Sequence, residues 1–537
     1  MTTNATPAAQ TVIVGTTNFN FAEWTFDASD AGEDVRITAI KPKATVGTAS
    51  TEDDVVNQQL FLVSGGTETA LQPIVQPTEG TATTTFTLST PLVVRKATTV
   101  VIRLRGDMTA NAGTSQTYAF GISGQTGVVA IGDVTASTVT PTVTDSAGST
   151  MTTASTGSFT VADDASNPTT SGLAVSGQTG YTLGEMRFTA TNEDIDITEL
   201  HVTTTTQNTG VTRNQVGKMY LVVDGVTKAE VIPTSTEAST PVTFVMTQGT
   251  VRVLKGSTGL KVTLKADWNQ IGTNLPAVAG RGIATSVAND AYAGVGVQSA
   301  TKIAAGSKSG TYTGQGFLLF KGLPTVSFPN PVAGPVPSGG TVAFFRFTVS
   351  AGTTADIGVY KFNFTISTTS ATVTSFQLFE TPGASELGLW NNANREPQRI
   401  YTAMSGGRGG IYGFSSASGS AASSSLFDTG TDGVTQGGEF RPIAVGSSKV
   451  FELRGTFGGS HELDPSSRPL SQVVVELLGD NAFPSSTYPL SASVASAGPT
   501  SGIANPDDNR DSDFIWSDLN VGNNSSTATQ TAEWTNG

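Results

Sequence analysis

The chain repeats itself about 160 residues apart, and this repeat limits its possible folds more than any other feature. GEDVRITAI (32–40) and NEDIDITEL (192–200) both place an acidic pair ahead of an alternating apolar run. The segments before them also correspond, since FAEWTF (21–26) aligns with LGEMRF (183–188). Self-similarity at so long a period predicts tandem domains, each large enough to bury its own core.

A third, more divergent copy follows later in the chain. Phe345 and Phe347 take the places of Met186 and Phe188, and Asp356 takes the place of an earlier aspartate. Because 537 residues exceed the size at which a single core stops growing, several domains are expected. We predict a first repeat at 1–133, a linker and second repeat at 134–300, a Pro-rich junction and third repeat at 301–490 with an insertion at about 383–440, and a tail at 491–537.

Within each copy the apolar residues alternate with polar ones. In DVRITAI (34–40) Arg36 and Thr38 alternate with apolar residues, and in TVVIRLRG (99–106) Arg103 and Arg105 alternate with Ile102 and Leu104, which is typical of a strand with one wet face. Thr, Ser, Ala and Val dominate the composition and suit pleated surfaces rather than helices. The sequence therefore predicts an all-β protein of tandem, immunoglobulin-like antiparallel β-sandwich domains.

Charge and composition exclude several classes of function. The net charge is −14 and the 29 basic residues are scattered, whereas nucleic-acid binding needs clustered Lys and Arg. There is no apolar run of the length a membrane-spanning helix requires. The absence of cysteine excludes disulfides and thiolate chemistry. We therefore expect no nucleic-acid partner and no membrane span.

The sequence offers no recognisable catalytic constellation. The two histidines, His201 and His461, lie in different repeats, and neither lies in a pattern that predicts a nucleophile and its base. The motifs of serine hydrolases, zinc proteases and P-loop proteins are absent from the sequence. We therefore expect no enzymatic activity and assign no catalytic or cofactor-binding residue.

Acidic clusters are the remaining polar signal. Carboxylates gathered in a turn are the oxygen ligands that Ca²⁺ prefers, so calcium is the one cofactor considered. The alternative is that these acids are solvated turn residues, with Asp34 and Asp194 capping turns through hydrogen bonds to the backbone. The candidate calcium ligands are Asp27, Asp30, Glu33, Asp34, Glu193, Asp194, Asp507, Asp508, Asp511 and Asp513.

The insertion in the third repeat is rich in Gly and Ser but carries several aromatic residues. A long ordered loop of this kind is often a contact element, and the alternative is a mobile decoration. The candidate interface residues are Trp390, Tyr401, Tyr412 and Phe414.

Some motifs resemble a known family. EDVRIT, EDIDIT, LKVTLKAD and the C-terminal DSDFIWSDLN (511–520) with TAEWTNG (531–537) are similar to the repeats and tail signature of large secreted surface proteins of Patescibacteria. The resemblance implies an exported, S-layer-like structural role. It also implies that a further segment commonly follows the tail, so the chain is expected to be a fragment or a processed product.

The residues and the resemblance together predict a structural protein of the extracellular cell surface. We expect copies of the chain to bind one another in an S-layer-like lattice or a filament, because repeated contacts between identical units propagate. A cell-envelope glycan is a further expected partner. One alternative is an adhesin or carbohydrate-binding module that uses the third-repeat insertion, and another is a phage or pilus-like fibre protein.

Overall fold

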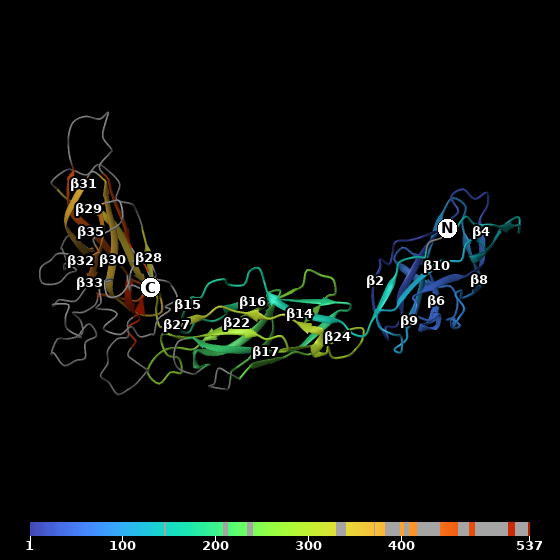
Figure 1. Ribbon diagram of the computed structural model, residues 1–537, viewed down its shortest axis with the longest axis horizontal. Coiled ribbons are helices and arrows are strands. Elements are labelled where there is room, and N and C mark those ends of the chain that lie inside the picture. The colour runs from blue at the N-terminus through green and yellow to red at the C-terminus, as the bar shows by residue number, and fades with distance from the viewer. Residues whose placement is uncertain are drawn as a thin grey trace, which may run out of the picture.

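A computed structural model shows three β-sandwich domains in a row (Figure 1). The predicted all-β class with tandem antiparallel sandwich domains is confirmed. The structure describes residues 1–143, 147–207, 213–233, 240–328, 340–369, 371–381, 398–401, 408–415, 441–459, 472–477, 479, 514–520 and 535–536. Within these ranges the helices are short 3₁₀ turns, and none is long and apolar enough to cross a membrane.

Domain 1, residues 1–154, stacks one sheet of order β1-β3-β9-β6-β7 on two smaller sheets, β2-β13-β10-β5 and β12-β11-β4-β8. Its elements are β1 (Thr2–Thr3), β2 (Gln10–Ile13), β3 (Phe19–Asp27), β4 (Val35–Ile40), β5 (Pro42–Val46), η1 (Glu52–Asp54), β6 (Val55–Ser64), β7 (Thr67–Ala70), β8 (Phe86–Val94), β9 (Thr99–Met108), β10 (Thr117–Ile122), η2 (Gln125–Gly127), β11 (Val128–Gly132), β12 (Thr138–Val139) and β13 (Met151–Ala154).

Domain 2, residues 158–320, repeats this arrangement with the sheets β19-β18-β22-β16-β14-β25 and β15-β27-β23-β17-β20. Its elements are β14 (Ser158–Asp163), β15 (Gly172–Val175), β16 (Tyr181–Thr191), β17 (Ile195–Gln207), η3 (Arg213–Gln215), β18 (Val216–Val223), β19 (Val226–Val231), β20 (Val242–Val245), β21 (Arg252–Val253), β22 (Leu260–Trp268), β23 (Arg281–Val287), β24 (Tyr292–Gly296), η4 (Ala305–Ser307), β25 (Lys308–Ser309), β26 (Tyr312–Thr313) and β27 (Phe317–Phe320).

Domain 3 begins at residue 324 and pairs a sheet of order β28-β29-β35-β31 with a sheet centred on β30. Its elements are β28 (Pro324–Ser327), β29 (Thr341–Ala351), β30 (Ile357–Thr369), β31 (Ala371–Thr381), β32 (Gln398–Tyr401), β33 (Arg408–Ser415), β34 (Arg441–Ile443), β35 (Ser448–Gly459), β36 (Gln472–Leu477), β37 (Phe514–Ser517) and β38 (Thr535–Asn536).

Local chemistry explains a difference between the first two domains. β17 is one continuous strand that pairs with β24 at its start and with β23 at its end. In domain 1 two strands, β4 and β5, make the corresponding pairings with β11 and β10. Pro42 begins β5, and because proline has no N–H to give to a ladder it interrupts the strand at that point.

The domains are joined by linkers of equal length. β13 ends at Ala154 and β14 begins at Ser158, so residues 155–157 connect domains 1 and 2. Likewise β27 ends at Phe320 and β28 begins at Pro324, so residues 321–323 connect domains 2 and 3. Both β13 and β27 lie parallel to the second strand of their own domain. Domains 1 and 2 therefore both end in the sheet that contains their second strand, and three linker residues separate each of them from the domain that follows.

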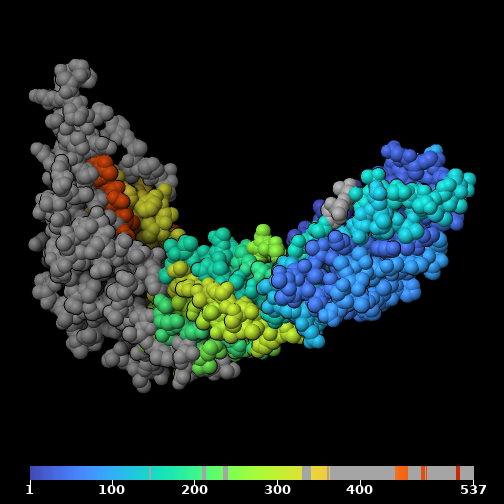
Figure 2. Space-filling view, turned by 45° about the vertical axis from the view of Figure 1, so that its right-hand side comes forward, coloured from blue at the N-terminus to red at the C-terminus, as the bar shows by residue number. Residues whose placement is uncertain are grey.

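The row of domains has one direction and is bent rather than straight (Figure 2). We call the end of a domain that faces its predecessor the near end and the opposite end the far end. In domain 1, β9 starts beside the turn after β3 and finishes at Met108, which accepts a hydrogen bond from Gly15 close to the far end. The near end of domain 1 therefore points away from domain 2, and the N-terminus lies on that side (Figure 1).

Candidate functional site

A buried carboxylate holds the linker between domains 1 and 2. Glu193, at the near end of domain 2, is 0% exposed. Its Oε1 accepts the Gly157 N–H of the linker at 2.8 Å. The backbone N–H groups of Gln298 and Ser299 donate to its Oε2 at 3.0 and 2.9 Å, and the Ser299 hydroxyl donates to Oε1 at 2.9 Å. We call this arrangement the linker clasp, because one side chain ties the incoming linker to a loop of the receiving domain.

The second acid of the pair fixes the adjacent loop. Asp194 Oδ1 accepts the Lys255 N–H at 2.8 Å, so the carboxylate caps the turn that leads into β22. The Lys255 ammonium then donates across the domain boundary to Gln10 Oε1 at 3.2 Å. Asp194 therefore has the turn-capping geometry that the sequence offered as the alternative to calcium, and its loop touches domain 1.

Domain 1 contains the same acid pair at its own near end. Val134 and Thr135 donate backbone N–H groups to Glu33 Oε2 at 2.6 and 3.0 Å, and the Thr135 hydroxyl also donates to Glu33. Asp34 Oδ1 accepts the Lys96 N–H at 2.7 Å. The hydrogen bonds from Thr135 and Val134 lower the pKa of the Glu33 carboxyl. Glu33 is only partly buried, and these donors all come from its own domain.

Domain 3 replaces the glutamate with alanine and supplies its carboxylate from another strand. Asp356 keeps the loop-capping role by accepting the Val445 N–H at 2.7 Å. Asp518 is 2% exposed, and its Oδ2 accepts the Lys321 N–H of the linker at 2.7 Å. Its Oδ1 accepts the Asn520 N–H at 3.1 Å. Burial raises the pKa of Asp518, although these backbone donors oppose the shift.

The two versions of the linker clasp exclude each other sterically. Ile195 pairs with Gly296, and a side chain at Gly296 would collide with the Glu193 carboxylate. In domain 3, Ile357 is the equivalent of Ile195. Because Gly358 pairs with Ser517 on an antiparallel strand, Ile357 lies opposite Asp518, which therefore takes the position of Gly296. A glutamate on one strand thus requires glycine on its neighbour, whereas the Asp518 version occurs with the small Ala355 in the glutamate's place.

Apolar packing distinguishes the two junctions. The ring of Phe320 at the end of domain 2 lies 5.1 Å from the ring of Trp516 in domain 3, and both side chains are buried. One continuous apolar core therefore runs through domains 2 and 3. Domain 1 has a separate core, so its junction with domain 2 depends on polar contacts.

Most of the predicted calcium ligands that the structure describes accept hydrogen bonds from nearby backbone groups. Asp27 accepts the Ser29 N–H at 2.8 Å together with the Ser29 hydroxyl, which lowers the pKa of Asp27. Asp30 is exposed in the same turn. Across the described residues, no group of three or more His, Asp or Glu side chains is placed to hold a metal ion. Four of the predicted ligands lie outside the described residues: Asp507, Asp508, Asp511 and Asp513.

The predicted aromatic interface falls partly within described strands. Tyr401 ends β32, and Tyr412 and Phe414 lie in β33. β33 pairs with β30, so this part of the insertion extends the second sheet of domain 3. Trp390 lies outside the described residues. The interface role of these aromatics stays a prediction.

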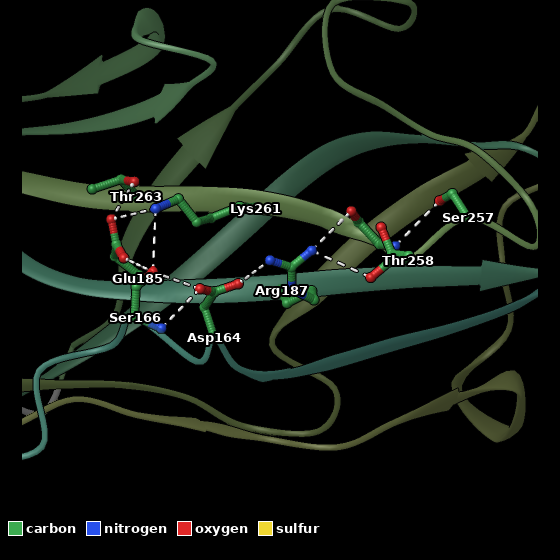
Figure 3. Close-up of polar contacts among 9 residues, drawn as sticks. Asp164, Ser166, Glu185, Arg187, Ser257, Thr258, Lys261 and Thr263 are labelled. Atoms are coloured by element: carbon green, nitrogen blue, oxygen red, sulfur yellow. Dashed lines mark hydrogen bonds and ion pairs between the residues drawn. The ribbon is translucent and has the colours of Figure 1, made fainter.

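A network of charged side chains covers the outer face of the six-stranded sheet of domain 2, which contains β16 and β22 (Figure 3). Glu185 pairs with Lys261 at 2.9 Å, and Arg187 pairs with Asp164 at 2.5 Å. Burial opposes ionisation of Glu185, but hydrogen bonds from Ser166 and Lys261 lower its pKa overall. These charges are paired across neighbouring strands, so the network stabilises the sheet rather than leaving groups for a ligand.

Asp518 and the charged network were not singled out in the sequence. DSDFIWSDLN was recognised as a tail signature, but the hydrogen bond from Asp518 to a linker nearly 200 residues earlier follows only from the fold. The alternation in GEMRFT (184–189) places Glu185 and Arg187 on one face of a strand. That spacing was the available signal for the charged network.

The fold and the linker clasps define a protein of stacked β-sandwich domains with ordered junctions. No family model and no curated protein matches the chain. Among solved structures, a Corynebacterium diphtheriae protein described as membrane anchored is 10% identical over 87% of this chain and 85% of its own, with a TM-score of 0.18.

Two further structures have lower TM-scores. Escherichia coli alpha-2-macroglobulin activated by porcine elastase is 9% identical over 89% of this chain and 32% of its own, with a TM-score of 0.10. A GH78 family rhamnosidase of Bacillus sp. GL1 is 9% identical over 83% of this chain and 53% of its own, with a TM-score of 0.09. Scores this low carry no argument, and the resemblance to Patescibacteria surface proteins stays a prediction.

Proposed function

We propose that this chain is a structural protein of the extracellular cell surface whose copies associate into an S-layer-like lattice or a filament. The observation that carries the proposal is the pair of three-residue linkers, each bound by a buried carboxylate of the following domain. Such junctions limit the relative movement of the domains. A protein with fixed domain positions can present its contacts at regular spacing, which a periodic assembly requires.

The surface chemistry supports the same proposal. Only 13% of the residues are charged, and on one sheet of domain 2 Arg187 and Lys261 are paired with Asp164 and Glu185. Exposed aliphatic side chains occur on that domain as well, including Val245 at 72% and Ile232 at 66% exposure. Such surfaces favour contact with other protein surfaces over binding of nucleic acid or small anions.

Electron microscopy of the purified chain tests this function. We expect sheets or filaments with a regular repeat, formed in calcium, in chelator, or in both. Assemblies that dissolve in chelator would support the proposed calcium sites, and assemblies that persist would argue against them. A chain that remains monomeric in both conditions at about 100 μM would contradict the proposed function, since a dissociation constant weaker than this provides only about 5.5 kcal/mol.

An adhesin that recognises glycans through the third-repeat insertion is the second candidate. The β32–β33 pair favours it, because it adds an aromatic-bearing hairpin to the edge of a sheet. Glycan-array binding that is lost in a Tyr401→Ala, Tyr412→Ala variant would support the adhesin, and unchanged binding would count against it.

A further inference from the structure

We propose that domain 2 binds a small inorganic anion of the size of chloride inside its far end, where Arg213, Gln215 and Trp268 are buried. The chain passes there from β17 in the eight-stranded sheet to β18 in the six-stranded sheet, and the η3 turn leads directly into β18. The inference does not depend on the proposed assembly, because it concerns the interior of one domain.

Arg213 is buried without an acidic partner among the described residues. It is 4% exposed, its Nε donates to Thr204 Oγ1 at 2.9 Å, and its Nη2 has no hydrogen-bond partner. Arg187 of the same domain is more exposed, yet it is paired with Asp164. Burial lowers the pKa of Arg213, and no described carboxylate opposes this shift. A buried charge of this kind is costly unless an opposite charge lies beside it, so the guanidinium group favours an anion.

The guanidinium group lies between the two sheets. Its acceptor Thr204 is 1% exposed and follows Leu200 and Val202 on the same face of β17, and both of these residues belong to the apolar core. The surroundings of Arg213 therefore exclude bulk water. Electrostatic attraction between this side chain and an anion is screened less there than at the surface.

Two further buried side chains at this end have polar atoms without a hydrogen-bond partner in the described part of the chain. Gln215 is 0% exposed, and neither its Oε1 nor its Nε2 is paired. Its backbone oxygen accepts the N–H of Asn269, the residue after Trp268, at 2.8 Å. Trp268 is 3% exposed, pairs with Val216 next to Gln215, and has an unpaired Nε1. N–H donors from η3 and β22 therefore gather at one end of the core, and such donors bind anions.

Burial also limits the size of the ligand. The three side chains are at most 4% exposed, so a phosphate or an organic acid would have to displace them. A monatomic anion needs far less room. A water molecule enclosed with the anion would donate to Gln215 Oε1.

Domain 1 has a carboxylate at the equivalent position. The η1 turn leads into β6 as η3 leads into β18, and β6 and β18 lie beside the equivalent strands β9 and β22. Asp54 of η1 thus corresponds to Gln215, and its Oδ2 accepts the Tyr118 hydroxyl at 2.6 Å and the Thr51 N–H at 2.9 Å. A bound anion would supply in domain 2 the negative charge that Asp54 supplies in domain 1.

Hydrogen exchange of the full chain tests the site, with chloride replacing the bulky anion gluconate at constant ionic strength. We expect exchange in peptides from β18 and β23 to slow by about tenfold for each tenfold rise in chloride above its dissociation constant, equivalent to about 1.4 kcal/mol. Peptides from β9 of domain 1 are the internal control and should not change. Exchange in domain 2 that does not respond to chloride would overturn the proposal.

Gln215→Asp locates the site, because it gives Arg213 a carboxylate where domain 1 has Asp54. We expect this variant to exchange more slowly than the native chain in low chloride and to lose the response to chloride. Gln248→Asp is the matched control, since Gln248 is exposed in the same domain, and it should respond to chloride as the native chain does. A full chloride response in Gln215→Asp would contradict the assignment.

Anomalous diffraction from crystals of the native chain in bromide decides the question even if Gln215→Asp fails to fold. We expect a bromide peak within hydrogen-bond distance of Arg213 Nη2. Water alone at that position would overturn the proposal.

Discussion

At the scale of single residues, the acid pair is a structural device. Glu193 and Asp194 accept backbone N–H groups that their loops would otherwise leave without a partner inside the fold. Carboxylates suit this role because one side chain offers two oxygens and four acceptor positions, and because a bond to a charged acceptor is stronger than a neutral one. The same pair therefore recurs where two domains meet.

Replacing Glu193 by Gln should destabilise domain 2 by about 2 kcal/mol. The amide NH₂ group would face backbone N–H groups that now donate to the carboxylate, and the remaining amide oxygen is uncharged. Glu33→Gln is the matched variant in domain 1, where we expect a smaller loss because the side chain is partly exposed. Hydrogen exchange in increasing urea, read on peptides from β22 for domain 2 and from β9 for domain 1, measures both. Equal effects of the two substitutions would contradict this account.

Asp518 should make the junction of domains 2 and 3 sensitive to pH. Its pKa is raised by burial in the folded chain, so its favourable contribution is complete below the pKa of unfolded Asp, about 3.9, and is lost as pH rises through the folded value. Asp518→Asn cannot ionise. We therefore expect the stability of Asp518→Asn relative to the native chain to increase from pH 4 to pH 8.

Urea unfolding of the variant and of the native chain, followed by total tryptophan fluorescence across that pH range, measures this difference. A comparison of the variant with the native chain at each pH removes the contribution of Glu452, whose pKa is lowered by hydrogen bonds from Arg346 and Arg454 against the effect of burial. A difference in stability that does not change with pH would show that Asp518 has an ordinary pKa.

At the scale of elements, the sequence predicted more of the fold than of the site. The period of two in DVRITAI and the 160-residue repeat were enough to predict tandem β-sandwiches, since both follow from local patterns. The partner of Asp518 could not be predicted, because hydrogen bonds between distant segments depend on strand order and register. For the same reason the acid pair left both calcium binding and turn capping open.

The two versions of the linker clasp should be interchangeable as a set. Glu193→Ala removes the carboxylate, and Gly296→Asp introduces a side chain that collides with Glu193. Each change alone should destabilise domain 2 by about 2–3 kcal/mol. The double variant recreates the residues of domain 3 and should recover at least 1 kcal/mol of the summed loss. Hydrogen exchange of β22 peptides in increasing urea measures the coupling, and purely additive losses would contradict the exchange.

At the scale of the whole molecule, the two junctions differ in what holds them. Domains 2 and 3 share an apolar core through Phe320 and Trp516, whereas domains 1 and 2 meet through Glu193 and the Lys255–Gln10 hydrogen bond. The second junction has both the Asp518–Lys321 hydrogen bond and the apolar burial of two aromatic side chains, whereas the first has polar contacts alone. The first junction is therefore expected to open more readily.

Limited proteolysis should detect this difference. We expect cleavage within residues 155–157 before cleavage within 321–323, and Glu193→Gln should accelerate the first cut by about tenfold for each 1.4 kcal/mol of lost local stability. Glu33→Gln serves as the control, because its carboxylate binds no linker in the structure. Fragment masses from a time course identify the sites, and earlier cleavage at 321–323 would contradict the ranking.

The short linkers also determine how the molecule would carry tension. A pull on domain 2 passes from Ala154 at the end of β13 through three residues to Ser158 at the start of β14. Both strands are paired along their length, β13 with β2 and β14 with β16, so the load shears many hydrogen bonds together instead of peeling them one at a time. Single-molecule stretching should therefore record high, separate rupture forces for the individual domains.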